Sequence, residues 1–231
     1  MPDILDIKNP RARPLGPLLV VMACVLALTG CGATKVKPEI KLPKALIEPL
    51  DLDVGIYYGP EYRKFEYRET RWGSDWQISL GEVHVRLTND LFAQAFTHTR
   101  VLEQFPGESA PAPVKAVIEP RIEQFSFVTP RDTNSNFYAV TIKYRLNLST
   151  PTGALVDSFK FTGYGTADSE GLSAEKPLQV ATNRAMRDAA SKFLVQFPEQ
   201  AAVKRLVHGE ALVAAEQGQG TSEAEEVPMV E

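Results

Sequence analysis

Cysteine and histidine are the side chains that could carry nucleophilic, redox or metal chemistry in this chain of 231 residues, and both are scarce. The two cysteines are Cys24 and Cys31, and the three histidines are His84, His98 and His208. A catalytic nucleophile needs a neighbouring base and a third group that orients the base, and the sequence contains no G-x-S-x-G segment. We therefore expect no enzyme activity, no disulfide framework and no cysteine-based zinc site.

Two short patterns contain the residue types of a phosphate or cation site. The segment 163–165, Gly-Tyr-Gly, follows a predicted strand, but Asp168 stands where a dinucleotide-binding loop needs its last glycine. Asp51 and Asp53 would point to the same side of a strand, although two carboxylates are fewer ligands than a hard cation requires. We interpret the first pattern as a strand end and the second as a solvated strand face, and we expect no cofactor and no bound metal.

The amino terminus has the charge and hydropathy order of an export signal. Lys8, Arg11 and Arg13 precede an apolar segment at 15–28. Its length fits the roughly 7 to 15 residues of a secretory signal and is short of the roughly 20 that span a bilayer. Residues 1–30 are therefore expected to form a signal peptide.

The segment 28–31, Leu-Thr-Gly-Cys, resembles the bacterial lipobox. The resemblance implies cleavage between Gly30 and Cys31, a diacylglycerol on the Cys31 sulfur and a fatty acid such as palmitate on the new amino group. Several acyl chains together give durable membrane attachment. Gly32 stands where an Asp would retain an enterobacterial lipoprotein in the inner membrane, which implies the periplasmic face of the outer membrane. The alternative is a signal-anchor helix that happens to contain a cysteine.

Composition limits the domain count and the classes of partner. Hydrophobic residues make up 44% of the chain, enough for one main core. The formal net charge is −4, from 25 Lys and Arg against 29 Asp and Glu. Nucleic acid is not an expected partner, because its binding surfaces are rich in clustered Lys and Arg.

Hydrophobic periodicity predicts an α+β domain over residues 51–197, with a mostly antiparallel β-sheet and two main amphipathic helices packed on one face. Alternation predicts strands, and spacings of three and four predict helices. The expected strands are 51–58, 61–71, 114–128 with a bulge or edge at Pro120, 137–149 and 154–167, and the expected helices are 79–98 and 175–197. Residues 72–76 have the composition of a loop, and His84 and His98 are expected on a helix surface or boundary.

The segments that flank this domain differ from it in composition. Residues 31–50 carry lysines and prolines and predict a lipid anchor followed by an extended tether, which could hold the domain some tens of ångströms from the membrane. Residues 198–215 predict a short helical extension. Residues 216–231 contain glutamates and no Lys or Arg and predict a disordered acidic tail.

Aromatic and basic side chains alternate in the segment 57–76, which is the best candidate contact surface. Tyr, Trp and Arg are enriched at binding hot spots, because they combine large area with a polar group. The alternative is a hairpin whose aromatic rings cap the core. The candidate partner-binding residues are Tyr57, Tyr58, Tyr62, Arg63, Phe65, Tyr67, Arg71, Trp72 and Trp76.

The order of these features, with the lipobox first and an Ala-rich helix last, resembles small bacterial outer-membrane lipoproteins of the YajG-like, curli-assembly-like and transport-auxiliary groups. The phrase "LPKALIEPLDLDVGIYY" at 42–58 also carries the resemblance. It implies a lipid-anchored periplasmic accessory in envelope assembly or transport, which acts by protein–protein contacts with envelope proteins and often forms a homo-oligomer. A lipoprotein that binds glycan or peptidoglycan through its aromatic rings is the alternative function.

Overall fold

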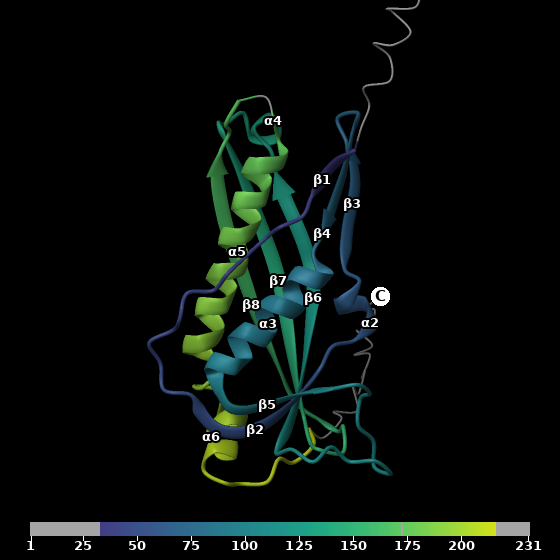
Figure 1. Ribbon diagram of the computed structural model, residues 1–231, viewed down its shortest axis with the longest axis vertical. Coiled ribbons are helices and arrows are strands. Elements are labelled where there is room, and N and C mark those ends of the chain that lie inside the picture. The colour runs from purple at the N-terminus through teal and green to yellow at the C-terminus, as the bar shows by residue number, and fades with distance from the viewer. Residues whose placement is uncertain (1–32, 172, 216–231) are drawn as a thin grey trace, which may run out of the picture.

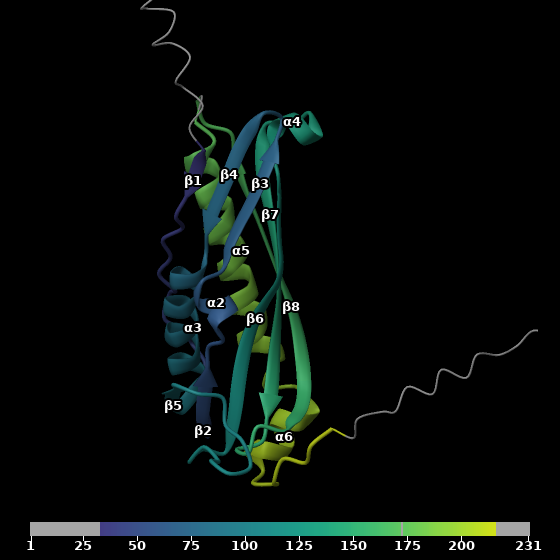
Figure 2. The ribbon, with the colours of Figure 1, turned by 90° about the vertical axis from the view of Figure 1, so that its right-hand side faces the viewer.

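The computed structural model of the chain describes residues 33–171 and 173–215, which form two β-sheets with two long helices on one side. The body is elongated, and the long helix α5 runs along most of it (Figure 1). In the perpendicular view, both long helices lie on the same face of the larger sheet, as expected (Figure 2). The predicted signal peptide, Cys31 and the acidic tail lie outside the described residues.

The larger sheet is mixed, so the expectation of a mostly antiparallel sheet is only partly right. Its strand order is β5-β2-β6-β7-β8. β6, β7 and β8 form the predicted antiparallel meander, whereas β2 pairs in parallel with both β5 and β6. The β2–β5 pair is parallel because a hairpin and a helix follow β2 in the chain and return it to the end of the sheet where β2 began, before β5 starts. The strands are β2 (Leu50–Tyr57), β5 (Phe96–Leu102), β6 (Ala116–Val128), β7 (Phe137–Ser149) and β8 (Leu155–Asp168).

A second sheet of three strands lies beside the upper half of β6 in Figure 1. Its hairpin consists of β3 (Glu66–Arg71) and β4 (Ser74–Ser79), and the short helix α2 (Pro60–Arg63) precedes it. Trp72 and Gly73 join the two strands with φ values of 57° and 74°, the positive values of a two-residue type I′ turn. The prediction of a loop at 72–76 is therefore wrong, because the turn occupies only two residues.

The predicted tether is packed against the domain. β1 (Thr34–Val36) pairs in parallel with β4, and Val36 is 0% exposed. Farther along, side chains of α5 (Glu175–Gln196) donate hydrogen bonds to the backbone carbonyls of Lys37 and Glu39. The expectation of a free tether over 31–50 is wrong for this part, because the helix supplies the hydrogen bonds that the extended backbone lacks.

The two predicted long helices are confirmed. α3 (Gly81–Ala95) ends three residues before the expected limit at His98, and residues 96–102 form the edge strand β5 instead. α6 (Ala201–Val207) lies in the predicted helical extension and contributes to the same hydrophobic core. α4 (Pro130–Thr133) connects β6 to β7. His84, expected near the surface, is 0% exposed, because α3 turns this side chain toward Tyr144 of β7.

Gly163 and Gly165 lie inside β8, so their interpretation as a strand end is wrong. A Cβ atom at Gly163 would lie 2.1 Å from the Ala185 carbonyl oxygen, and one at Gly165 would lie 2.3 Å from that of Ala181. The glycines therefore allow α5 to approach the sheet more closely than side chains would permit.

Candidate functional site

The structure separates the nine candidate residues of segment 57–76 into three groups. Tyr58, Tyr62 and Trp76 are buried in the core. Arg63 and Trp72 are exposed, and the remaining four, Tyr57, Phe65, Tyr67 and Arg71, are half-buried. The segment thus does not form one continuous contact surface.

Tyr58 and Tyr62 lie in the core, before the hairpin begins at Glu66. The rings of Tyr58 and Tyr62 stack with their centroids 5.6 Å apart. The Tyr58 hydroxyl donates a hydrogen bond of 2.7 Å to Asn89 of α3, and burial raises the pKa of Tyr58 to about 12. Neither ring is accessible to a partner.

The hairpin packs its aromatic side chains on β6. The ring centroid of Tyr67 lies 5.0 Å from that of Phe125, and Trp76 lies 5.0 Å from Phe127. These contacts fix the hairpin against the larger sheet. The turn of the hairpin lies beyond these contacts, at the end of the molecule (Figure 1).

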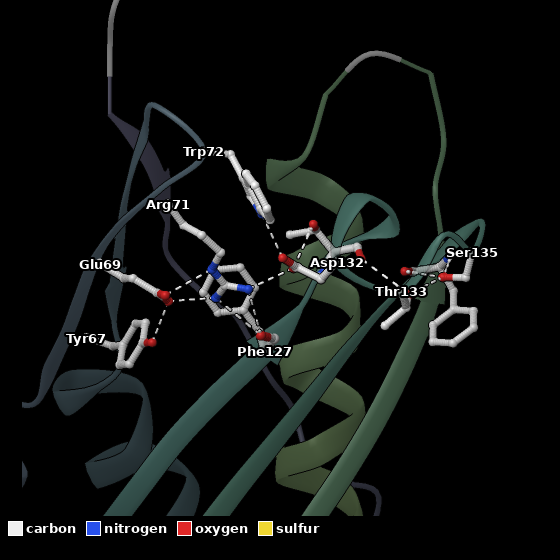
Figure 3. A network of polar contacts seen from close by, with 10 residues as sticks. Tyr67, Glu69, Arg71, Trp72, Phe127, Asp132, Thr133 and Ser135 are labelled. Carbon is white, nitrogen blue, oxygen red and sulfur yellow. Dashed lines mark hydrogen bonds and ion pairs between the residues drawn. The ribbon is translucent and has the colours of Figure 1, made fainter.

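Arg71 links the hairpin to the β6–β7 connection at this end of the molecule (Figure 3). Its guanidinium donates to Glu69 at 2.6 Å and to Asp132 at 2.7 Å, and it lies 4.4 Å above the centroid of the Phe127 ring. Asp132 belongs to α4, so this ion pair links the hairpin to the β6–β7 connection. Bidentate and charge-assisted contacts of this kind hold a fixed geometry.

Asp132 is the central acceptor of the network. Its carboxylate accepts hydrogen bonds from the Trp72 indole Nε1 at 2.8 Å and from the backbone N–H of Thr129 at 2.7 Å. Desolvation alone would raise its pKa, but these hydrogen bonds and the charge of Arg71 outweigh it and lower the pKa to about 2. Asp132 therefore remains a carboxylate at neutral pH.

Trp72 is the large aromatic side chain that this end exposes, with 59% of its surface accessible. The Arg131 guanidinium lies 4.7 Å from the centroid of its ring. We define the hairpin tip as Arg71, Trp72, Gly73, Arg131 and Asp132. An open groove of about 690 Å³ lies beside it and is also lined by Thr34, Lys35 and Glu175.

Sequence reasoning missed Arg131 and Asp132. The signal available was the segment 129–132, Thr-Pro-Arg-Asp, in which Thr at the N-cap and an acid three residues later form a capping box. Their distance in the chain from Trp72, 60 residues for Asp132, hid the contact with the hairpin.

The hairpin tip exposes an ordered aromatic ring with a cation stacked on it. In the part of the chain that the structure describes, no group of three or more His, Cys, Asp or Glu side chains is placed to hold a metal ion. Within residues 33–171 and 173–215, no helix combines the length and apolar character needed to cross a bilayer.

Comparisons with known proteins give weak similarities of fold. No family model and no curated protein matches the chain. Protein XCC0632 from Xanthomonas campestris (DUF330) is 11% identical with a TM-score of 0.43, over 71% of this chain and 92% of its own. A Helicobacter pylori protein described as a homolog of neuraminyllactose-binding hemagglutinin is 11% identical with a TM-score of 0.46, over 75% and 97%. Uncharacterized lipoprotein B from Nitrosomonas europaea is 14% identical with a TM-score of 0.35, over 76% and 99%. Scores in this range assign neither a family nor a function to the chain.

Proposed function

We propose that the chain is a lipoprotein of the bacterial envelope, anchored through Cys31 on the periplasmic face of the outer membrane, and that it acts by contact with other envelope proteins. The observation that carries the anchoring is the position of the lipobox. Cys31 stands three residues before Thr34, where the folded body begins. The segment before Cys31 thus has the features of an export signal, and the segment after Cys31 is a folded domain.

The open edge of β5 supports the second half of the proposal. β5 is the last strand on one side of the larger sheet, and residues 97–101 are all exposed. An exposed edge strand offers backbone N–H and C=O groups to an added strand. An extended segment of a partner protein can therefore extend the sheet here.

The other edge strand of the larger sheet, β8, is covered by side chains of α5, so the two edges differ. Three α5 side chains bond to the backbone of β8. Asp188 accepts from Tyr164 N–H at 2.9 Å, Lys192 donates to the Thr162 carbonyl at 2.7 Å, and Arg184 donates to the Thr166 carbonyl at 2.6 Å. Among the described residues, no side chain makes such a hydrogen bond to the backbone of β5.

Crosslinking in intact cells tests both halves. Cys31→Ser should leave an uncleaved precursor that is lost from the outer membrane. Thr99→Lys, on β5, should reduce the recovery of crosslinked envelope proteins, because an edge lysine opposes strand addition. Thr141→Lys on the interior strand β7 is the matched control. Equal recovery from the two lysine variants would contradict the role of β5, and retention of Cys31→Ser would contradict the anchor.

Glycan binding receives less support. It needs accessible aromatic faces, and Tyr58, Tyr62 and Trp76 are buried. Binding of the purified protein to isolated cell-wall sacculi, unaffected by Thr99→Lys, would favour this alternative function.

A further inference from the structure

We propose that the hairpin tip is a membrane-contact surface, which rests in the interfacial layer of the bilayer that holds the lipid anchor. The proposal rests on the lipidation of Cys31 proposed above. It names a second contact with the membrane, made by the folded domain itself, and it fixes which end of the domain faces the lipid.

The covalent chain limits how far this end can be from the bilayer. Two residues lie between Cys31 and Thr34, so their Cα atoms are at most about 11 Å apart when the chain is fully extended. Thr34 is already paired with Trp76 on β4, so the domain begins at that point. An acylated Cys31 therefore leaves the first strand of the domain within a few residues' reach of the lipid headgroups.

β1 lies at the same end as the hairpin tip. In both ribbon views, β1, the β3–β4 turn and α4 stand at one extremity of the long axis, with α6 at the other (Figures 1 and 2). Thr34 and Lys35 line the same groove as Trp72 and Arg131. The end held close to the membrane is thus the end that exposes Trp72.

The side chains at the tip suit the interface between lipid and water. Tryptophan is enriched there, because its ring is apolar and its N–H is polar. Arg131, whose guanidinium lies over the ring, can pair with lipid phosphate through its N–H groups while it stays stacked on the indole. Of the acids at this end, Asp132 is paired with Arg71, and Glu175 lines the groove beside the tip.

The backbone holds Trp72 outward at an energetic cost. A bulky side chain at a φ of 57° is unfavourable, and Asn, Asp or Gly are the residues that usually occupy this turn position. The bond to Asp132 fixes the indole in this place. Strained residues that their surroundings hold in place cluster at functional sites. A ring ordered in advance loses little entropy when lipid covers it.

The same geometry orients the domain. β7 has 13 residues and runs from the tip toward the opposite end, a length of about 40 Å at the usual rise of a strand. With the tip in the interface, the β7–β8 turn and the neighbouring end of the sheet project into the periplasm. The open edge of β5 lies toward that far end (Figure 1).

Site-specific quenching tests the proposal with the mature acylated protein in phosphatidylcholine and phosphatidylethanolamine vesicles. Removal of the signal peptide and acylation of Cys31 leave no free thiol, so one engineered cysteine can carry a polarity-sensitive fluorophore. Ser74→Cys places it beside the tip, and Thr152→Cys places it in the β7–β8 turn as the matched control. Headgroup-labelled nitroxide lipids should quench the fluorophore at position 74 by about twofold or more and leave the one at 152 unchanged. Trp72→Ala should weaken the quenching at 74, whereas Tyr164→Ala, which removes an exposed ring of β8, should not.

The outcomes separate this proposal from the one on which it rests. Protein that floats with the vesicles but shows equal quenching at the two positions would overturn the membrane-contact surface and leave the lipid anchor standing. Undiminished quenching in Trp72→Ala would overturn it as well, because the contact is assigned to that ring. Protein that fails to float with the vesicles would overturn both proposals.

Discussion

Lowering the pH from neutral should destabilise the fold through His84. This side chain is fully buried between α3 and β7. Its Nδ1–H donates to the Leu80 carbonyl at 2.8 Å, and its Nε2 accepts from the Tyr144 hydroxyl at 2.7 Å. The neutral ring satisfies both contacts, and a second ring proton would add a buried charge.

The magnitude follows from the pKa in the two states. Burial lowers the pKa of His84 from 6.5 to about 4, although the bond to Leu80 opposes the shift. The unfolded chain therefore binds a proton below about pH 6.5, and the folded chain does so only below about pH 4. Stability is lost as the pH falls through this window, by about 3 kcal/mol in total at 1.36 kcal/mol per pKa unit.

Urea unfolding of wild type and His84→Gln at a series of pH values measures this effect. Glutamine does not titrate, so the difference in unfolding free energy between the two proteins should change by about 3 kcal/mol between pH 6.5 and 4. Taking the difference removes the contribution of the carboxylates, which both proteins share. Parallel stability curves for wild type and His84→Gln would refute the assignment.

Three further substitutions test the packing and the tip by urea unfolding at neutral pH. Gly163→Ala should cost about 2 to 3 kcal/mol, because its Cβ would lie 2.1 Å from the Ala185 oxygen, and wild-type stability would contradict the close helix contact. Tyr62→Phe should leave stability unchanged or raise it by about 1 kcal/mol, because the Tyr62 hydroxyl is buried without a partner in the described residues. A clear loss of stability would show that the Tyr62 hydroxyl makes a hydrogen bond in solution. Asp132→Asn should cost about 1 to 2 kcal/mol, because it removes the capping carboxylate and the acceptor charge for Arg71, and no loss would mean that the tip network is not formed in solution.

The long elements could be predicted from the sequence, because each repeats its hydrophobic period several times. The helix at 175–197 and the strand at 137–149 are examples, and both agree with the structure within a residue or two. Pro120 also behaves as expected. It lies beyond Ile118, the last residue of β6 that pairs with β2, so at Pro120 the β6 strand pairs with β7 alone and forms an edge.

The missed strands lack such a signal. β5 reads Phe-Thr-His-Thr-Arg-Val-Leu, and both sides of its interior are exposed, so no alternation marks it. β1 has three residues and exists because β4 offers an edge to it. The sequence does not predict β4, because Trp72-Gly73 is not one of the dipeptides that usually mark a type I′ turn.

The candidate site could be predicted only in part, because local patterns do not show which residues meet in the fold. The composition of segment 57–76 predicts a contact surface, but it does not show which rings face the core. Burial of Tyr58 and Tyr62 depends on α3, and the fixed position of Trp72 depends on Asp132 of α4. These partners are 31 or more residues away, a separation at which local patterns carry no information.

Mass spectrometry of the amino-terminal peptide, from protein extracted out of the outer membrane with detergent, tests the central claim most directly. The peptide should begin at Cys31 and carry the mass of a diacylglycerol on the sulfur and of an acyl chain on the amino group. A terminus before Cys31, or a Cys31 without lipid, would contradict the anchor and, with it, the orientation assigned to the domain.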